Sequence, residues 1–301
     1  MIDYRVRTLL TACEQGSFVA AAKALCITQP AVSQQIRSLE EELGVRVLDR
    51  GNGKLMLTPQ GELVLRCAKK MAGLESMLRE DLKDSVTMAD HLIIGITHTA
   101  ESNPIAEALA RFCAENPGFS IKIITDSISN LYSKLITYEL DLAIVTERRE
   151  EEDLRFLQLD TDYMVVAVSP THPFAKRNIV TLDELKRERM ILRLPNSATR
   201  NQLTAHLESL NMSVDDFNVI LEVDNLATIK DLIRRDFGVS ILPKSVCLDE
   251  IRKKKMAVLP IENLSVLREF NIAYRTDFSH MEILKQIVRY YNETLKNYKI
   301  I

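Results

Sequence analysis

The spacing of apolar residues changes near residue 90 and divides this chain of 301 residues into two differently built parts. Before that point, apolar side chains recur every three or four residues, as they do along one face of a helix. After it, short continuous apolar runs alternate with helical patterns, which is typical of a mostly parallel sheet covered on both faces. The chain is therefore predicted to be a multidomain α+β protein with a helical N-terminal part and an α/β remainder.

The N-terminal part carries the start and stop signals of three short helices. Gly16 ends the first helix, and Ser17 is suited to cap the second. Thr28 is suited to cap the third, Pro30 fits its first turn, and Gly44 ends it. Because the second and third helices are short and joined by a tight turn, they are predicted to form a helix-turn-helix.

A small hairpin and a long helix are predicted next. The segment LDRGNGKLMLT at 48–58 has a Gly-Asn-Gly centre between apolar residues, which is typical of a β-hairpin, or wing. A helix from about 59 to 85 would be roughly 40 Å long, too long for so small a domain to cover. We expect it to pack against a second copy of itself, although it could instead lie on the C-terminal part. Its apolar seam consists of Leu63, Cys67, Met71, Leu74, Leu78 and Leu82.

The third helix presents a polar face on the side away from its apolar stripe. Glutamine can pair with adenine and arginine with guanine through two hydrogen bonds each, and serine can bond phosphate or a base edge. The same side chains on an ordinary solvated helix would look identical, so spacing alone leaves both interpretations open. Basic residues of the wing could add phosphate contacts. The residues predicted to contact DNA are Gln29, Pro30, Ser33, Gln34, Arg37, Arg50 and Lys54.

Polar residues follow the predicted strands of the α/β part. In such folds a ligand binds at the carboxyl ends of the strands, where helix N-termini offer unsatisfied N–H groups. Hydroxyl groups there suit a small anion or a carboxylate, although each one could simply cap a helix. Arg200 is the one cation among the candidates. The predicted effector-binding residues are Thr97, His98, Thr99, Ser127, Ser129, Thr146, Ser197, Thr199, Arg200 and Asn225.

Charge and cysteine usage narrow the class of protein. The net charge is −3, and residues 1–58 hold seven basic and six acidic side chains, so one copy would bind phosphate weakly and DNA binding would depend on oligomerisation. The five cysteines include no CxxC pair, which argues against disulfides and zinc and favours buried thiols. The longest apolar runs are far below the roughly 18 residues of a membrane span. Without a secretion signal, we expect a cytoplasmic protein with no membrane partner and no cofactor.

The segment 17–61 resembles the winged helix-turn-helix of LysR-type transcriptional regulators. The similarity lies in TQPAVSQQIRSLEEELG at 28–44, in LDR of the wing and in LTPQG at 57–61. It continues along essentially the whole chain in HLIIGI, FCAENPGFSIKI, LDLAIVTE, VVAVSPTHPFA and DFGVSILPKSV. The chain departs from the family pattern at Cys26, at Gly53 where a wing Arg is frequent, and at Tyr138 and Asp236, which replace common glycines.

The resemblance implies a complete domain plan. It implies a winged helix-turn-helix DNA-binding domain over 1–58, a linker or dimerisation helix over 59–89 and a two-lobed, periplasmic-binding-protein-like effector domain. Lobe I would comprise 90–161 with 269–301, and lobe II would comprise 162–268. Strands crossing near 162–168 and 266–274 would act as the hinge.

The resemblance also implies partners. The two lobes would enclose a small inducer, to which Thr99 and Ser197 would contribute. The assembly would be a dimer of dimers on double-stranded DNA carrying an interrupted inverted repeat, with RNA polymerase as a further partner.

Two other functions compete with a regulator. An α/β enzyme would need a catalytic motif, but GxSxG, HExxH and GxGxxG are absent and the five histidines show no metal-ligand spacing. The second alternative is a ligand-binding protein whose N-terminal helices serve only for oligomerisation. A DNA binder would lose affinity steeply as salt rises, whereas such a protein would not bind DNA at all.

Overall fold

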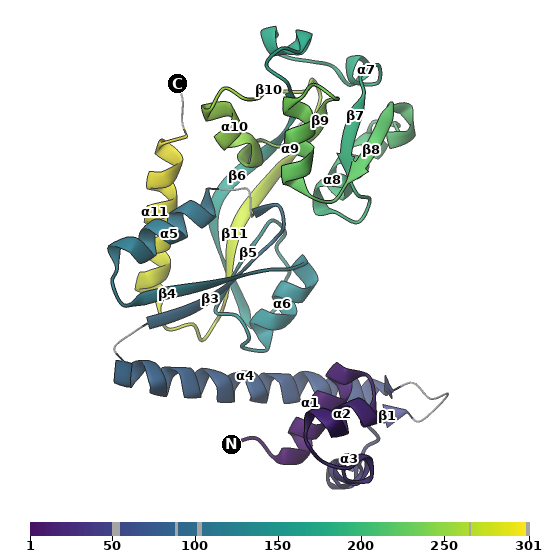
Figure 1. Ribbon diagram of the computed structural model, residues 1–301, viewed down its shortest axis with the longest axis vertical. Helices are drawn as coiled ribbons and strands as arrows, with labels where there is room; N and C mark the ends of the chain where they lie inside the picture. The colour runs from purple at the N-terminus through teal and green to yellow at the C-terminus, as the bar shows by residue number, and fades with distance from the viewer. Residues whose placement is uncertain (50–54, 88–89, 101–103, 265, 299–301) are drawn as a thin grey trace. The chain divides into compact units, whose positions relative to one another are not determined.

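The computed structural model describes residues 1–49, 55–87, 90–100, 104–264 and 266–298. The chain forms two compact units, one of residues 1–91 with 132–140 and one of residues 92–131 with 141–301. Within the described ranges no helix is both long and apolar enough to cross a membrane. Figure 1 shows the order of the elements along the chain.

Three short helices form the start of the first unit: α1 (Tyr4–Gln15), α2 (Phe18–Ala24) and α3 (Gln29–Leu43). Their ends follow the predicted signals. The Ser17 hydroxyl accepts a hydrogen bond from the amide of Ala20, and α1 ends at Gly16 with φ of 62°. The apolar faces of the three helices share one core, in which Leu9 and Ile36 are buried. The predicted helix-turn-helix is confirmed.

A short hairpin follows α3 and is fastened to it. Strands β1 (Leu48–Asp49) and β2 (Met56–Leu57) pair antiparallel. The Glu40 carboxylate of α3 accepts hydrogen bonds from the amides of Val47 at 2.8 Å and Leu48 at 3.1 Å, which ties β1 to the helix. The predicted DNA contacts Arg50 and Lys54 lie outside the described residues.

Helix α4 (Pro59–Thr87) exposes its apolar seam. Leu63, Leu78 and Leu82 are 53%, 56% and 60% exposed in the single chain. Burial of such side chains would contribute about 1.5–3 kcal/mol each, so a helix of this kind favours a partner. Cys67 on the same seam is also exposed, as is Cys26, so the expectation that the cysteines are buried is wrong for these two. Neither side chain lies on a face that packs against another described part of this chain.

The second unit is a mixed sheet with helices packed against it. Its strands are β3 (Asp90–Ile96), β4 (Phe119–Thr125), β5 (Leu142–Val145), β6 (Leu154–Val168), β7 (Met190–Arg193), β8 (Val219–Val223), β9 (Ser240–Pro243), β10 (Ala257–Leu259) and β11 (Leu267–Arg275). Its longer helices are α5 (Ile105–Glu115), α6 (Ile128–Ile136), which lies partly in the first unit, α8 (Ala198–Ser209), α9 (Leu226–Arg234) and α11 (Met281–Lys296). The short helices are α7 (Leu182–Leu185) and α10 (Leu248–Arg252).

Two long antiparallel strands connect two separate cores. Strand β6 pairs with β11 along most of its length, and Figure 1 shows both strands running from one group of elements to the other. We call the group whose core includes Phe112 and Ile272 lobe I, and the group whose cores include Phe174 and Ile229 lobe II. A substrate-sized cavity can form where two such lobes meet.

The expectation of a mostly parallel sheet is wrong for the connecting strands. Pairs β3–β5 and β7–β8 are parallel, as expected. Strand β6 runs antiparallel to β9, β10 and β11, and β11 also runs antiparallel to β5. The apolar pattern of a buried strand is the same whichever way its neighbour runs, so the direction was not readable from the residues.

Candidate functional site

The outer face of α3 is polar and open. Gln29, Gln34 and Arg37 are exposed and Ser33 is half-buried, while Val32 on the inner face is buried. Among the residues that the structure describes, the four polar side chains make no hydrogen bond or ion pair with the protein. Pro30 is exposed in the first turn. A helix face whose donors and acceptors are unused by its own fold can offer them to base edges.

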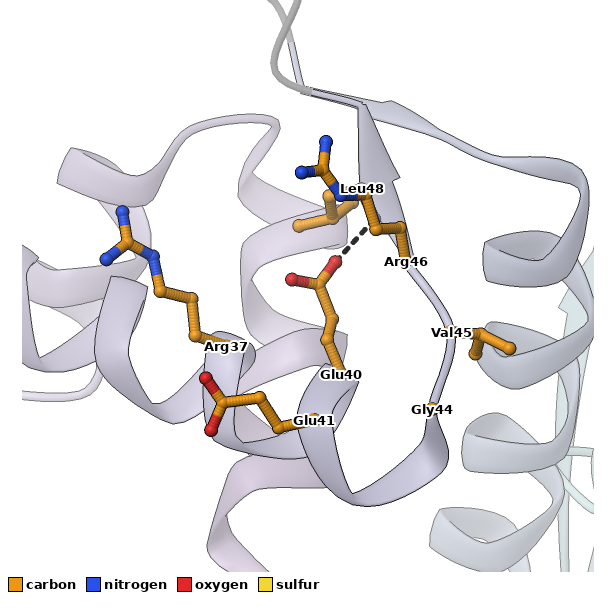
Figure 2. Close-up of a pocket in the computed structure, with 7 residues that line it drawn as sticks. All are labelled: Arg37, Glu40, Glu41, Gly44, Val45, Arg46 and Leu48. Carbon is orange, nitrogen blue, oxygen red and sulfur yellow. Dashed lines mark hydrogen bonds between the residues drawn. The ribbon is translucent and has the colours of Figure 1, made fainter.

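A hollow of about 560 Å³ lies between the C-terminal half of α3 and the start of the hairpin. Figure 2 shows Arg37 of α3 and Arg46, which precedes β1, extending toward the same end of this hollow. Both side chains are exposed. Arg46 was not among the predicted DNA contacts. The sequence could have suggested this residue as a DNA contact, because it lies between Gly44, which ends the helix, and the wing.

A second cavity, of about 400 Å³, opens within the second unit between the strand ends of lobe I and the start of α8 in lobe II. Its volume falls in the range of small-molecule sites. Lobe I supplies the loop after β3, the turn at the start of α6 and the end of β5, and lobe II supplies the loop before α8. Seven predicted effector-binding residues line it: Thr97, His98, Thr99, Ser127, Ser129, Thr146 and Ser197.

The other three predicted residues do not line this cavity. Thr199 is buried at 3% exposure, in the first turn of α8. Arg200 is engaged by Glu222 at 3.1 Å and donates to the carbonyl oxygen of Arg193 at 3.3 Å. The Asn225 side chain accepts a hydrogen bond from the amide of Thr228 at 3.1 Å and so caps α9. Arg200 and Asn225 therefore have partners inside lobe II, and Thr199 is buried there.

Charged residues that the sequence did not single out also line the cavity. The cations are Arg149 and Arg193, and the carboxylates are Asp126, Glu147 and Asp224. Arg149 lies in the charged run ERREEED at 147–153, which is typical of a solvated loop, and Arg193 ends β7 after three apolar residues. Asp126 directly follows β4, so its position at a strand end was a usable signal.

Two of the cations already have side-chain acceptors. The Arg193 guanidinium, 6% exposed, lies 3.2 Å from an Asp224 carboxylate oxygen. Arg149 donates to the Ser129 hydroxyl at 2.8 Å. Ser197 caps α8 by accepting from the amide of Arg200 at 3.2 Å. The Thr97 hydroxyl is different, because it is buried and has no hydrogen-bond partner among the described residues.

The cavity therefore combines hydroxyl, amide and guanidinium donors with several carboxylates. Such a lining can hold and orient a small polar molecule. Among the described residues, no group of three or more His, Cys, Asp or Glu side chains could hold a metal ion.

Comparison with known proteins gives consistent matches. The family model described as "LysR substrate binding domain" matches residues 87–296. The model described as "Bacterial regulatory helix-turn-helix protein, lysR family" matches residues 4–62. Together the two models span nearly the whole chain.

Relatives are similar to this chain over most of their length. A "Probable RuBisCO transcriptional regulator" of Trieres chinensis is 26% identical over 301 residues, covering 97% of this chain and 96% of that protein. An "Uncharacterized HTH-type transcriptional regulator YybE" of Bacillus subtilis (strain 168) is 28% identical over 239 residues, covering 79% of this chain and 81% of that protein.

Solved structures share the fold. A full-length OxyR variant from Pseudomonas aeruginosa matches with a TM-score of 0.67 at 23% identity, covering 97% of this chain and 95% of that chain. Full-length CbnR complexed with its target DNA matches with a TM-score of 0.66 at 18% identity, covering 98% of this chain and 100% of that chain.

Proposed function

The chain belongs to the LysR family of transcriptional regulators, and from this premise we propose a role for each of its two sites. As a LysR-type regulator it has a helix-turn-helix domain that binds DNA and a substrate-binding domain that takes an effector. The resemblance stated from the sequence is thereby confirmed. We propose that α3 reads a specific DNA sequence and that the interlobe cavity holds the effector that controls the output.

For DNA reading, the observation that carries the proposal is the unused polar face of α3. Gln34 and Arg37 are exposed on the face opposite the core and make no hydrogen bond or ion pair with the described residues. A bidentate pair from either side chain to a base discriminates by about 1–3 kcal/mol. Gln29, Pro30 and Ser33 extend the same face toward the start of the helix, and Arg50 and Lys54 remain predicted phosphate contacts of the wing. Arg46 joins this set because it flanks the same hollow as Arg37.

For assembly, we propose that the chain acts as a dimer of dimers on an interrupted inverted repeat of double-stranded DNA. The exposed seam of α4 supports self-association. The near balance of seven basic and six acidic side chains over residues 1–58 means that one copy neutralises few phosphates. Several linked copies raise the effective concentration of each for its half-site, which multiplies the affinity.

For sensing, we propose a small anionic effector, in keeping with the hydroxyl, amide and guanidinium groups of the cavity. A ligand shifts an equilibrium only by binding one arrangement better than another. The connecting strands β6 and β11 would transmit such a shift between the lobes. We further propose that the paired DNA-binding domains contact RNA polymerase and that the protein works in the cytoplasm, where its DNA lies.

The proposal that α3 reads a specific DNA sequence is tested by selection from a pool of random-sequence duplexes. We expect the wild-type chain to enrich an interrupted inverted repeat, and its affinity for that duplex to fall steeply as salt rises. Gln34→Ala and Arg37→Ala should each weaken binding by about 1–3 kcal/mol in a mobility-shift assay.

The matched controls are Gln15→Ala and Arg187→Ala, which remove the same side chains from exposed positions off the α3 face. Both controls should bind like the wild type. Equal affinity of Gln34→Ala, Arg37→Ala and their controls would contradict the assignment of α3 as the reading helix.

A further inference from the structure

Arg268 is a buried cation whose side chain makes no hydrogen bond to any described residue. It lies on β11, where the two connecting strands pass between the lobes, and is 2% exposed. None of its three guanidinium nitrogens has a hydrogen-bond partner among the described residues. Buried polar groups are nearly always hydrogen-bonded, because leaving a charge desolvated and unpaired costs several kcal/mol. An arginine in this condition is free to accept a partner from outside the described residues.

The neighbouring carboxylate is already occupied. Asp162 is the register partner of Arg268 across β6 and β11. Its oxygens accept hydrogen bonds from the Ser245 amide at 3.1 Å, the Ser245 hydroxyl at 2.6 Å and the Tyr163 amide at 2.9 Å. Burial lowers the pKa of Arg268, while the charges of Asp162 and Glu147 act in the opposite direction. Among the described residues, the Arg268 guanidinium therefore lies across from the Asp162 carboxylate without a hydrogen bond to it.

Glu147 connects this arginine with the interlobe cavity. Glu147 lines the cavity, and its neighbour Arg148 lies 2.8 Å from the carboxylate of Glu269, the residue after Arg268 on β11. The cavity holds a second buried polar atom without a partner, the Thr97 hydroxyl at the end of β3. Arg268 does not itself line the cavity in this structure. A turn of its side chain toward the cavity would break no hydrogen bond to the described residues, because it makes none with them.

We propose that Arg268 is the anchor for the anionic group of the effector, and that this group is a small carboxylate. The proposal rests on the proposed function of the interlobe cavity. A planar guanidinium matches the two oxygens of a carboxylate through parallel charge-assisted hydrogen bonds. Arg149 and Arg193 are less suited, because each already donates to a side chain of the protein. Since Arg268 lies where both lobes meet, ligand pairing would favour one arrangement of the lobes over another.

The experiment measures binding of small anions to the full chain. Acetate, malonate, succinate, citrate, sulfate and phosphate are added as sodium salts, with sodium chloride at equal ionic strength as the reference. Melting temperature and isothermal titration report binding. We expect at least one carboxylate to stabilise the wild type in a concentration-dependent way, and Arg268→Gln to weaken its binding by about 10- to 100-fold. Arg268→Lys keeps the charge but not the planar fork, so its affinity should be intermediate.

Two further variants separate the anchor from the cavity. Arg187→Gln removes the same charge from an exposed position of lobe II and should bind like the wild type. Thr97→Val removes a cavity hydroxyl that has no partner in the protein, so it should weaken ligand binding without lowering the melting temperature measured without added anion. If Thr97→Val weakens binding but Arg268→Gln and Arg268→Lys do not, the cavity is the binding site and the proposal that Arg268 anchors the anion is wrong.

Three other results would overturn the proposed role of Arg268 or the proposed ligand class. A wild-type chain that no carboxylate stabilises overturns the proposal, while DNA binding tested separately keeps the regulatory function. Stabilisation by sulfate or phosphate and by no carboxylate overturns the ligand class. A lower melting temperature of Arg268→Gln without added anion, together with unchanged anion affinity, would make Arg268 a structural partner of Asp162 and Glu147.

Discussion

At the scale of residues, Glu75 fastens the first helix to the long helix. Its carboxylate accepts hydrogen bonds from Arg7 of α1 at 2.9 Å and from Arg79 of α4 at 2.8 Å, and from the amide of Ile2 at 3.3 Å. These donors stabilise the charged form and lower the pKa of Glu75 from 4.5 to about 2. Hydrogen bonds from Arg79 and then Arg7 have the largest effects.

This shift predicts an acid-dependent loss of stability. Because the pKa is lower in the folded chain, the contribution of Glu75 is fully present above about 4.5 and is lost as the pH falls toward 2. Thermal unfolding of wild type and Glu75→Gln should therefore differ most near neutral pH and converge in acid. A difference in melting temperature that stays constant from pH 6 to pH 3 would contradict this role.

The residues that line the interlobe cavity could be predicted only in part from the sequence. Hydroxyls such as Thr97 and Ser197 were expected at strand ends, and the structure brings them to one cavity with five other predicted residues. Their function there stays a prediction. The cavity cations Arg149 and Arg193 were missed, because whether a charged side chain turns to solvent or to a cavity depends on residues distant in sequence.

Two residues other than glycine adopt a left-handed backbone conformation. Tyr138 and Asp236 lie where the resemblance to the LysR family implies glycine, and they adopt φ angles of 62° and 61°. Side chains other than glycine adopt this left-handed region at a cost of roughly 1–2 kcal/mol. The turn geometry is kept although the residue that suits it best has been exchanged.

At the scale of elements, residues at both ends of α3, the helix proposed to read DNA, determine where it begins and stops. The Thr28 hydroxyl accepts a hydrogen bond from the amide of Ala31 at 3.3 Å, and Gly44 ends the helix with φ of 67°. The first turn that Thr28 caps contains Gln29 and Pro30. The cap thereby holds the part of the helix that is proposed to meet the DNA.

Removal of this cap should affect stability and DNA binding together. Thr28→Ala is expected to destabilise the N-terminal unit by about 1 kcal/mol and to weaken duplex binding by loosening the first turn. Thr28→Ser keeps the hydroxyl and should retain both properties. Denaturant unfolding and mobility shift measure the two effects. Equal behaviour of the alanine and serine variants would show that the cap is unimportant.

The connecting strands were only partly predictable. The apolar run MVVAVS indicated a strand at 164–169, whereas β6 extends over Leu154–Val168. Its first half mixes buried, half-buried and exposed residues and includes charged positions such as Arg155 and Asp160, so no continuous apolar run marks it. Pairing with β11 holds this half in the sheet, and that partner lies more than a hundred residues further along the chain.

At the scale of the whole molecule, self-association links the weak local charge to DNA binding. A single copy carries a net charge of −3 and exposes the apolar seam of α4. Burial of that seam between copies would place several α3 helices on one duplex. Affinity for DNA should then depend on the seam as well as on α3.

A charge placed on the seam tests this dependence. Leu78 is 56% exposed, so Leu78→Glu should fold normally but lower the molecular mass in solution measured by light scattering. Duplex affinity should fall by more than about tenfold, because the gain from linked sites is lost. Ser76→Glu adds the same charge to an exposed position of α4 off the seam and serves as the control. An unchanged mass for Leu78→Glu would remove the seam as the interface.

The sequence by itself determined the helix-turn-helix, the long helix with its seam and the existence of two α/β lobes, because caps, turns and apolar periodicity are local properties. Seven of the residues that line the cavity were also predicted, because they follow strands in the sequence. Only the tertiary structure decided the directions of β6 and β11, the charged residues of the cavity and the unbonded state of Arg268 among the described residues. Burial and partnership of a polar group depend on side chains far away along the chain, and no local pattern encodes them.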